Sequence, residues 1–306
     1  MAYRNTSDPL ARTDSIAGHD HSSNPAGQYG RVCVIYHYFE VNQQYRENLS
    51  HFLTFGVLPD VDYVIVLSGG CSLELPDLPN IRYLNAPNRN RDYGGHTFAL
   101  HHGVPVDAYS HFIFVNSSVR GPYLPMYADK PWYNVFLDLL DDEVGLVGST
   151  INILSPDSPH SDEFRRRHGG TPPYSHVQST VFAIPRVMLM RLLDAGIFDL
   201  NQGPLSHMHT VTDYEILMSQ LVIRGGLNIR SLLPEYNTID YRIAHRETNP
   251  TSKDGDPCYA GGFFGRTLHP YETIFLKTNR GMYPPGFFTA LTDSMRLART
   301  TPPLEV

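Results

Sequence analysis

The sequence predicts an α/β fold in which helices cover both faces of a mostly parallel central sheet. In the first half, short apolar segments rich in β-branched residues alternate with segments whose apolar residues recur at helical spacing. Several of the apolar segments have no polar face, which is typical of strands covered on both sides. Polar or glycine-rich residues follow four of these segments in turn. In such sheets ligands bind beyond the carboxyl ends of the strands, so these residues predict a binding site.

The individual elements follow from the same patterns. Strands are expected in the first half at residues 31–36, 62–67, 80–84, 110–115 and 144–147. Helices are expected at residues 42–55, where Gly56 gives a stop signal, and at 94–101. The second half predicts strands at 176–184 and from 228 to 233, helices at 185–195 and 212–224, a loop over 246–265 and an extended piece at 272–277.

The predicted organisation is one domain with two peripheral ends. Residues 1–29 are polar and lack a hydrophobic period, which predicts a flexible leader. Residues 30–292 are expected to form a single domain, because no internal repeat or long linker divides them. Residues 293–306 are expected to be a peripheral tail.

Composition narrows the classes of function. The chain has 41% hydrophobic and 18% charged residues, which is ordinary globular composition. No apolar run approaches the roughly 18 residues of a membrane span, and the polar start lacks a secretory signal, so a cytoplasmic location is expected. A net charge of −7 argues against nucleic-acid binding. Three cysteines are too few for a disulfide scaffold or a zinc cluster.

The first two candidate clusters follow predicted strands. Residues 88–96 contain Asp92 and the Gly94-Gly95 pair, which permits close approach of a ligand to the backbone; the alternative is a turn with an Asp N-cap. Residues 116–122 place short polar side chains at the end of the strand 110–115, and the alternative there is a serine-rich turn.

Two further clusters lie in the second half. Residues 176–180 put Gln178 in an apolar strand, where it needs either a polar ligand or an internal partner. Thr212 and Glu215 fit a helix capping box, whereas Asp213 and Glu215 together fit a general base. His207 and His209 alternate as in a strand, but no third metal ligand is evident nearby.

The fifth cluster is basic. One short stretch contains His269, Lys277 and Arg280. Such a set of basic side chains suits the binding of a diphosphate; the alternative is that they are ordinary surface charges.

Taken in order, these blocks resemble nucleotide-sugar glycosyltransferases of the GT-A type, and among them the rhamnan-synthesis-like proteins. The resemblance spans roughly residues 31–282. The matching stretches are 90–100 (NRDYGGHTFAL), 112–125 (FIFVNSSVRGPYLP), 147–152 (VGSTIN), 176–184 (HVQSTVFAI), 213–236 and 268–280 (LHPYETIFLKTNR).

The resemblance implies a role for each block. It places a nucleotide-diphosphate donor across the strand ends and a catalytic carboxylate on the helix of Asp213 and Glu215. The donor-binding residues it implies are Tyr36, His37, Tyr38, Phe39, Asn88, Arg91, Asp92, Gly94, Asn116, Ser117, Ser118, Arg120, Lys277 and Arg280. His176 and Gln178 are expected to face the sugar or the acceptor.

The sequence departs from this family at its metal site. Asn116-Ser117-Ser118 stands where the Asp-x-Asp motif would bind Mn²⁺ or Mg²⁺. Two expectations stay open. In one, Asn116 and a serine ligate a metal weakly, and His269 matches a late histidine that touches the metal or the phosphate in some GT-A enzymes. In the other, Arg120, Lys277 and Arg280 neutralise the diphosphate without metal.

The function that follows is transfer of a hexosyl or deoxyhexosyl group from the donor to a hydroxyl of a glycan or other acceptor, as in polysaccharide biosynthesis. An inverting reaction with an Asp or Glu base is expected. The alternatives are a catalytically inactive nucleotide-sugar-binding protein of the same fold, favoured by the missing Asp-x-Asp, and a metal-dependent hydrolase that uses some of the 15 histidines.

Overall fold

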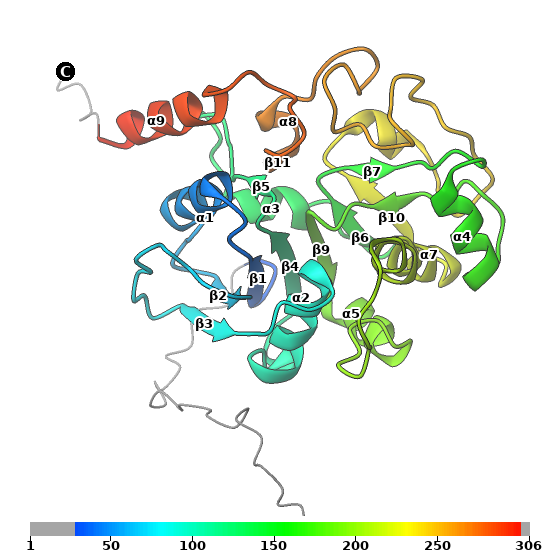
Figure 1. The fold of residues 1–306 in the computed structure, drawn as a ribbon, viewed down its shortest axis with the longest axis horizontal. Helices are drawn as coiled ribbons and strands as arrows, with labels where there is room; N and C mark the ends of the chain where they lie inside the picture. Colours follow the sequence, from blue (N-terminus) through cyan, green and yellow to red (C-terminus); the bar gives the residue numbers. More distant parts are fainter. Residues whose placement is uncertain (1–27, 301–306) are drawn as a thin grey trace, which may run out of the picture.

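The computed structural model describes residues 28–300, so nearly all of the predicted leader (1–29) and residues 301–306 lie outside the described part. Seven strands form the central sheet in the order β10-β6-β9-β4-β1-β2-β3, which runs from right to left across Figure 1. Only β9 runs antiparallel to its neighbours β4 and β6. The predicted α/β class with a mostly parallel sheet is therefore confirmed.

The strands of the central sheet are β1 (Val32–Tyr38), β2 (Asp62–Leu67), β3 (Ile81–Asn85), β4 (His111–Asn116), β6 (Val144–Gly148), β9 (Val181–Pro185) and β10 (Asn228–Ser231). The short pairs outside it are β5 (Val119–Arg120) with β11 (Leu276–Lys277), and β7 (Ile151–Asn152) with β8 (His176–Val177). The helices are α1 (Gln43–Phe55), α2 (Arg91–His102), α3 (Trp132–Leu137), α4 (Pro159–His168), α5 (Arg186–Asp194), α6 (His207–Thr210), α7 (Leu217–Arg224), α8 (Pro270–Thr273) and α9 (Phe287–Thr300).

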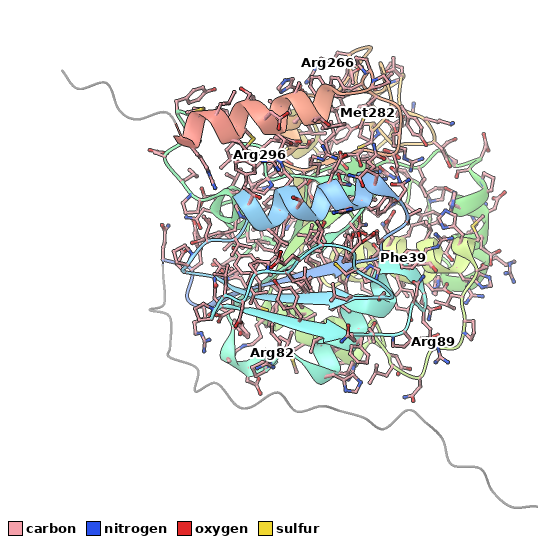
Figure 2. The ribbon with its side chains drawn as sticks, turned by 60° about the vertical axis from the view of Figure 1, so that its left-hand side comes forward. Phe39, Arg82, Arg89, Arg266, Met282 and Arg296 are labelled. Carbon is pink, nitrogen blue, oxygen red and sulfur yellow. The ribbon has the colours of Figure 1, made fainter. Side chains whose placement is uncertain are left out.

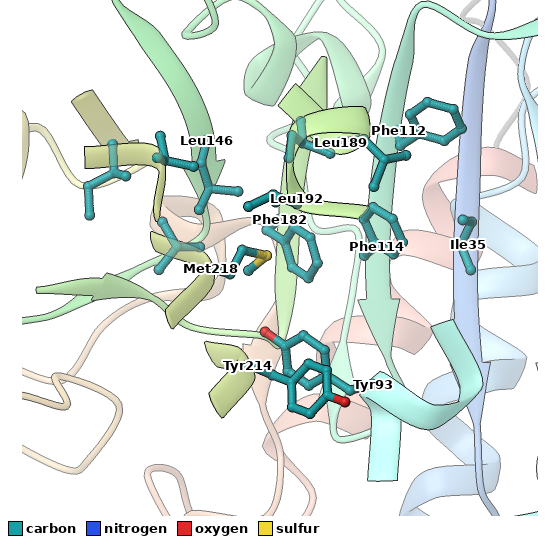
Figure 3. Packing of buried hydrophobic residues seen from close by; sticks show 14 of the residues in the cluster. Ile35, Tyr93, Phe112, Phe114, Leu146, Phe182, Leu189, Leu192, Tyr214 and Met218 are labelled. Carbon is teal, nitrogen blue, oxygen red and sulfur yellow. The ribbon is translucent and has the colours of Figure 1, made fainter. Parts of the chain in front are cut away.

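The two faces of the sheet carry separate hydrophobic clusters. Side chains alternate along a strand, so Cys33 and Ile35 of β1 face one cluster whereas Val34 and Tyr36 face the other. Helices α2, α5 and α7 pack on the first face, and α1 and α3 pack on the second. On the first face, the rings of Phe114 and Phe182 from neighbouring strands stack with centroids 4.6 Å apart (Figure 3).

Three predicted elements differ from the structure. The strand expected at 176–184 is divided: β8 pairs with β7 in a two-stranded sheet, β9 belongs to the central sheet, and residues 178–180 link the two. The helix expected from 212 begins earlier, at His207 with Ser206 as its N-cap, so the capping-box interpretation of Thr212 and Glu215 is wrong. The Thr212 hydroxyl instead donates to the carbonyl of Met208. Of the extended piece expected at 272–277, residues 272–273 belong to the helical turn α8, whereas residues 276–277 form strand β11.

The C-terminal helix α9 lies along α1 (Figures 1 and 2). The hydroxyl of Thr292 lies 2.9 Å from Nδ1 of the buried His51, and Arg299 donates to the carbonyl of Thr54. The predicted boundary after residue 292 therefore falls inside a helix that packs on the domain.

Asn42→Ala is expected to lower the free energy of unfolding by about 1 kcal/mol. The Asn42 side chain caps α1 by accepting from the backbone N–H groups of Gln44 and Tyr45 at 3.0 and 3.4 Å. Chemical denaturation measures the loss, with the exposed neighbour Gln43→Ala as the control. Equal stability of the two variants would show that the cap contributes nothing.

Candidate functional site

A cavity of about 640 Å³ lies at the carboxyl edge of the central sheet. Its floor includes His37 near the end of β1 and Asn116 at the end of β4, which pair in register on neighbouring strands. The loop 178–180, the helix after Ser206 and the segment after β11 contribute the other walls. This is the edge where ligands of parallel sheets bind.

The cavity brings together residues from all five sequence clusters. The predicted residues that line it are His37, Phe39, Asn88, Arg91, Asp92, Asn116, Ser117, Ser118, His176, Gln178, Glu215, Lys277 and Arg280. The predicted residues that do not line it are Tyr36, Tyr38, Gly94, Arg120, Asp213 and His269.

The alternation of β1 separates its three predicted residues. Tyr36 and Tyr38 point into the hydrophobic cluster beneath α1, and the Tyr38 hydroxyl donates to Glu40 at 2.8 Å. His37 points to the opposite face, where its Nε2 lies 3.0 Å from the Ser68 hydroxyl. Burial, and then the neighbouring His96, lower the pKa of His37 to about 3, so its ring is neutral at physiological pH.

The paired glycines at the start of α2 serve packing inside the protein. A Cβ on Gly94 would lie 1.8 Å from the carbonyl oxygen of Arg89, and one on Gly95 would lie 2.0 Å from the His37 ring. The space beside both is filled by the chain itself, so close approach to a ligand is not what requires these glycines.

The Arg120 side chain is bound by residues inside the protein. Its guanidinium is buried (3% exposed) and donates to Asn48 at 2.9 Å and to Glu47 at 2.8 Å, both on α1. Its charge is therefore balanced inside the protein and lies outside the cavity lining.

Asn116 and its neighbours form a closed hydrogen-bond network. The Asn116 amide nitrogen donates to Asp92 at 3.0 Å, and its oxygen accepts from the Ser118 backbone N–H at 3.0 Å and from the Ser118 hydroxyl at 2.6 Å. The network fixes the loop after β4 against the start of α2. It also gives the side-chain oxygen of Asn116 two hydrogen-bond donors.

Glu215 reaches the cavity from η2 (Val211–Ile216), a π-helical stretch between α6 and α7. Such stretches frequently occur at functional sites. The Ser179 backbone N–H donates to one carboxylate oxygen at 2.9 Å, and Nε2 of His176 lies 3.4 Å from the other. Burial alone would raise the pKa of Glu215, but His176, Lys277 and Ser179 outweigh it and lower the pKa to about 2. Glu215 is thus an anion throughout the neutral range.

Asp213 points away from the cavity, toward α4. Its carboxylate accepts two hydrogen bonds from Arg167 at 2.7 and 2.6 Å and lies 2.8 Å from Nε2 of His168. These partners outweigh burial and lower its pKa. Of the two predicted carboxylates, only Glu215 lines the cavity.

Gln178 lines the cavity, but its amide is paired inside the protein. The Thr150 hydroxyl donates to its oxygen at 3.0 Å, and its nitrogen donates to Asn152 at 2.8 Å. The internal-partner interpretation of this residue therefore accounts for its hydrogen bonds.

Lys277 and Arg280 share one carboxylate. Asp256 lies 3.7 Å from the Lys277 ammonium and 3.4 Å from the Arg280 guanidinium. Burial alone would lower the pKa of Lys277, but Asp256, Cys258 and Glu215 raise it, so the ammonium stays charged. Two cations against one carboxylate leave this wall of the cavity positive.

The loop 246–265 contributes to the cavity, which the sequence does not predict. Lys253, Asp254, Asp256 and Tyr259 from this loop line the cavity. The only signal in the sequence was the pair Asp254 and Asp256 in a glycine- and proline-rich stretch, which is ordinary for a surface loop. His207 also lines the cavity, from helix α6 rather than from the strand that was expected.

The residues expected to hold a metal ion do not fit that role. His269 caps α8 by accepting from the Tyr271 backbone N–H at 3.2 Å and does not line the cavity. Within residues 28–300 there is no group of three His, Cys, Asp or Glu side chains that could hold a metal ion. The same observation leaves the metal-dependent hydrolase without a site in this part of the chain.

Comparison with known proteins gives structural likenesses only. No protein-family model and no curated protein matches the chain. Among solved structures, a mannosyltransferase from Pyrobaculum calidifontis in complex with GDP-Man and Mn²⁺ is 18% identical, with a TM-score of 0.38 over 66% of this chain and 54% of that one. Galactosyltransferase LgtC with donor and acceptor sugar analogues is 11% identical, with a TM-score of 0.41 over 89% and 98%. A Drosophila galactosyltransferase 7 mutant with manganese, UDP-Gal and xylobiose is 8% identical, with a TM-score of 0.36 over 86% and 79%.

All three are glycosyltransferases by description, and none is described as a rhamnan-synthesis protein. Identities and scores this low assign no residue a role, so the function proposed below rests on the residues of this cavity. Across the described residues, no helix combines the length and apolar character of a membrane span.

Proposed function

We propose that the chain is a glycosyltransferase that moves a hexosyl or deoxyhexosyl group from a nucleotide-diphosphate donor to a hydroxyl of a glycan or other acceptor. The observation that carries the proposal is the joint lining of one cavity by polar strand ends, two cations on one wall and an anionic Glu215. The blocks that resemble glycosyltransferases in the sequence are the ones that meet there.

The donor would lie across the strand ends. Phe39 and Asp92 suit the base and ribose, and Lys277 with Arg280 suits the diphosphate. Glu215, which faces the cavity near His176, would accept the proton of the acceptor hydroxyl. The acceptor oxygen then bonds to the anomeric carbon while the bond from that carbon to the phosphate oxygen breaks. The nucleoside diphosphate leaves with the electron pair, in an inverting displacement.

A second candidate function has an observation of its own. A general base works best with a pKa near the operating pH, whereas the pKa of Glu215 is lowered to about 2 by partners that hold its carboxylate. This favours a nucleotide-sugar-binding protein of the same fold without transfer activity.

Ligand binding and product release together test both functions. Uridine, guanosine, adenosine, cytidine and thymidine diphosphates and their sugars are added to the protein, and the melting temperature is measured. At least one of them is expected to raise it, because a ligand that binds the folded state stabilises it by mass action. A transferase also releases free nucleoside diphosphate from the sugar donor when the acceptor is present, whereas the inactive binder releases none. No shift with any ligand would contradict both.

A further inference from the structure

The strand end after β4 offers no carboxylate to a divalent ion, because residues 116–118 are Asn-Ser-Ser. Hard ions such as Mg²⁺ and Mn²⁺ prefer anionic oxygen ligands. Here the side-chain oxygen of Asn116 already accepts two hydrogen bonds from Ser118. The nearest carboxylate on this side, Asp92, accepts the Asn116 amide nitrogen at 3.0 Å.

The other carboxylates of the cavity are held by hydrogen-bond donors and cations. Asp256 accepts the Cys258 backbone N–H at 2.8 Å and faces both Lys277 and Arg280. Asp254 accepts the Ser158 hydroxyl at 2.7 Å and lies 3.5 Å from His160. A cation added beside Asp256 would meet two positive side chains that are already there.

Lys277 is fixed beside that same strand end. It pairs with Val119 in the β5–β11 ladder, and the backbone N–H of the next residue, Thr278, donates to the Ser118 carbonyl at 3.1 Å. The backbone of Lys277 is thus held against residues 118 and 119, and its side chain lines the same cavity as residues 116–118. A positive charge therefore shares this cavity with the segment that stands where the Asp-x-Asp motif is expected.

The Lys277 ammonium lacks a hydrogen-bond acceptor among the described residues. Its partner Asp256 is 3.7 Å away, which is beyond hydrogen-bond distance, and the Lys277 side chain is 13% exposed. An ammonium has three N–H donors, and a largely buried charge is costly unless it is paired. These donors are available to an anion in the cavity.

We propose that Lys277 and Arg280 bind the donor diphosphate directly, in place of a divalent ion, so that donor binding and transfer need no metal. This inference rests on the proposed function, because it names what neutralises the same leaving group. Fixed cations at the point where negative charge develops stabilise the departing diphosphate as a metal ion would.

Calorimetric titration with the five nucleoside diphosphates, in EDTA and again in MnCl2, tests the metal requirement. The dissociation constant of the preferred nucleotide is expected to agree within about threefold between the two conditions. Binding that is lost in EDTA and restored by Mn²⁺ would overturn this inference and leave the proposed function standing. Absence of binding in both conditions would overturn the two together.

Lys277→Met identifies the group that replaces the metal. The variant keeps the apolar stem and removes the charge, and the loss of a charge-assisted hydrogen bond is expected to weaken nucleotide binding in EDTA by roughly tenfold to a hundredfold. Lys277→Arg is expected to recover most of the affinity. Lys130→Met is the matched control, because Lys130 is half exposed and pairs with Asp138 outside the cavity.

If Lys277→Met does not fold, Arg280→Gln supplies the same measurement, because Arg280 is 34% exposed and tolerates replacement more readily. Affinity in EDTA that equals the affinity of Lys130→Met would overturn the assignment for either variant.

Discussion

Glu215→Gln is expected to lower the rate of sugar transfer by about 10²–10⁴-fold, the usual contribution of a general base. Glutamine keeps an oxygen for the Ser179 backbone N–H and has nearly the same shape, so the π-helical stretch should persist. Nucleotide binding should change little, because the cations of the donor site are untouched. Because the pKa of Glu215 is lowered to about 2, the rate should show no titration of this group between pH 6 and 8.

Asp213→Asn is the matched control for this measurement. Asp213 lies two residues away on the same helix, but it points to Arg167 and His168 rather than into the cavity. Its variant is expected to keep the transfer rate within about threefold while losing roughly 1–3 kcal/mol of stability, the cost of weakening its charged hydrogen bonds. Equal loss of rate in both variants would mean that the effect comes from the helix as a whole. Full rate in Glu215→Gln would show that the base is assigned wrongly.

The sequence was informative about the strands because burial on both faces leaves a local signal. The apolar segments at 31–36, 62–67 and 110–115 each became a strand of the central sheet, and the order of polar blocks after them predicted the edge that carries the cavity. Helix 42–55 was predicted to within one residue, because an apolar stripe and Gly56 mark it.

The predictions that differ from the structure concern side chains whose direction is determined by tertiary contacts. The sequence does not distinguish Asp213 from Glu215 as a candidate base. The packing of α4 against η2 brings Arg167 to Asp213, which therefore forms an ion pair instead of facing the cavity. The place of Asp256 beside Lys277 could not be predicted, because it depends on the path of a long loop. Tyr36 was assigned to the donor site although the alternation of β1 turns it into the core.

Acidification is expected to destabilise the fold strongly between pH 6.5 and 5, through buried histidines on the two sides of β1. Burial, with a smaller contribution from the neighbouring His96, lowers the pKa of His37 to about 3. Burial also lowers the pKa of His51, beneath α9, to about 3. Three arginines near His51 add to that effect: Arg120, Arg296 and Arg299. The unfolded chain takes up protons near pH 6.5 and the folded one does not. Stability therefore falls as pH drops through 6.5, by on the order of 4 kcal/mol at pH 5 for the two rings together.

Chemical denaturation at pH 8, 6.5 and 5 measures this loss, and a variant with His37→Gln and His51→Gln isolates its source. The double variant is expected to be less stable at pH 8, because the hydrogen bonds to Ser68 and Thr292 change, but to lose much less stability on going to pH 5. The comparison uses the difference between the two pH values, so a general loss of stability does not affect it. A loss of 4 kcal/mol is a large share of the 5–15 kcal/mol that typically holds a domain folded. Wild-type protein as stable at pH 5 as at pH 8 would mean that both rings accept protons in the folded state.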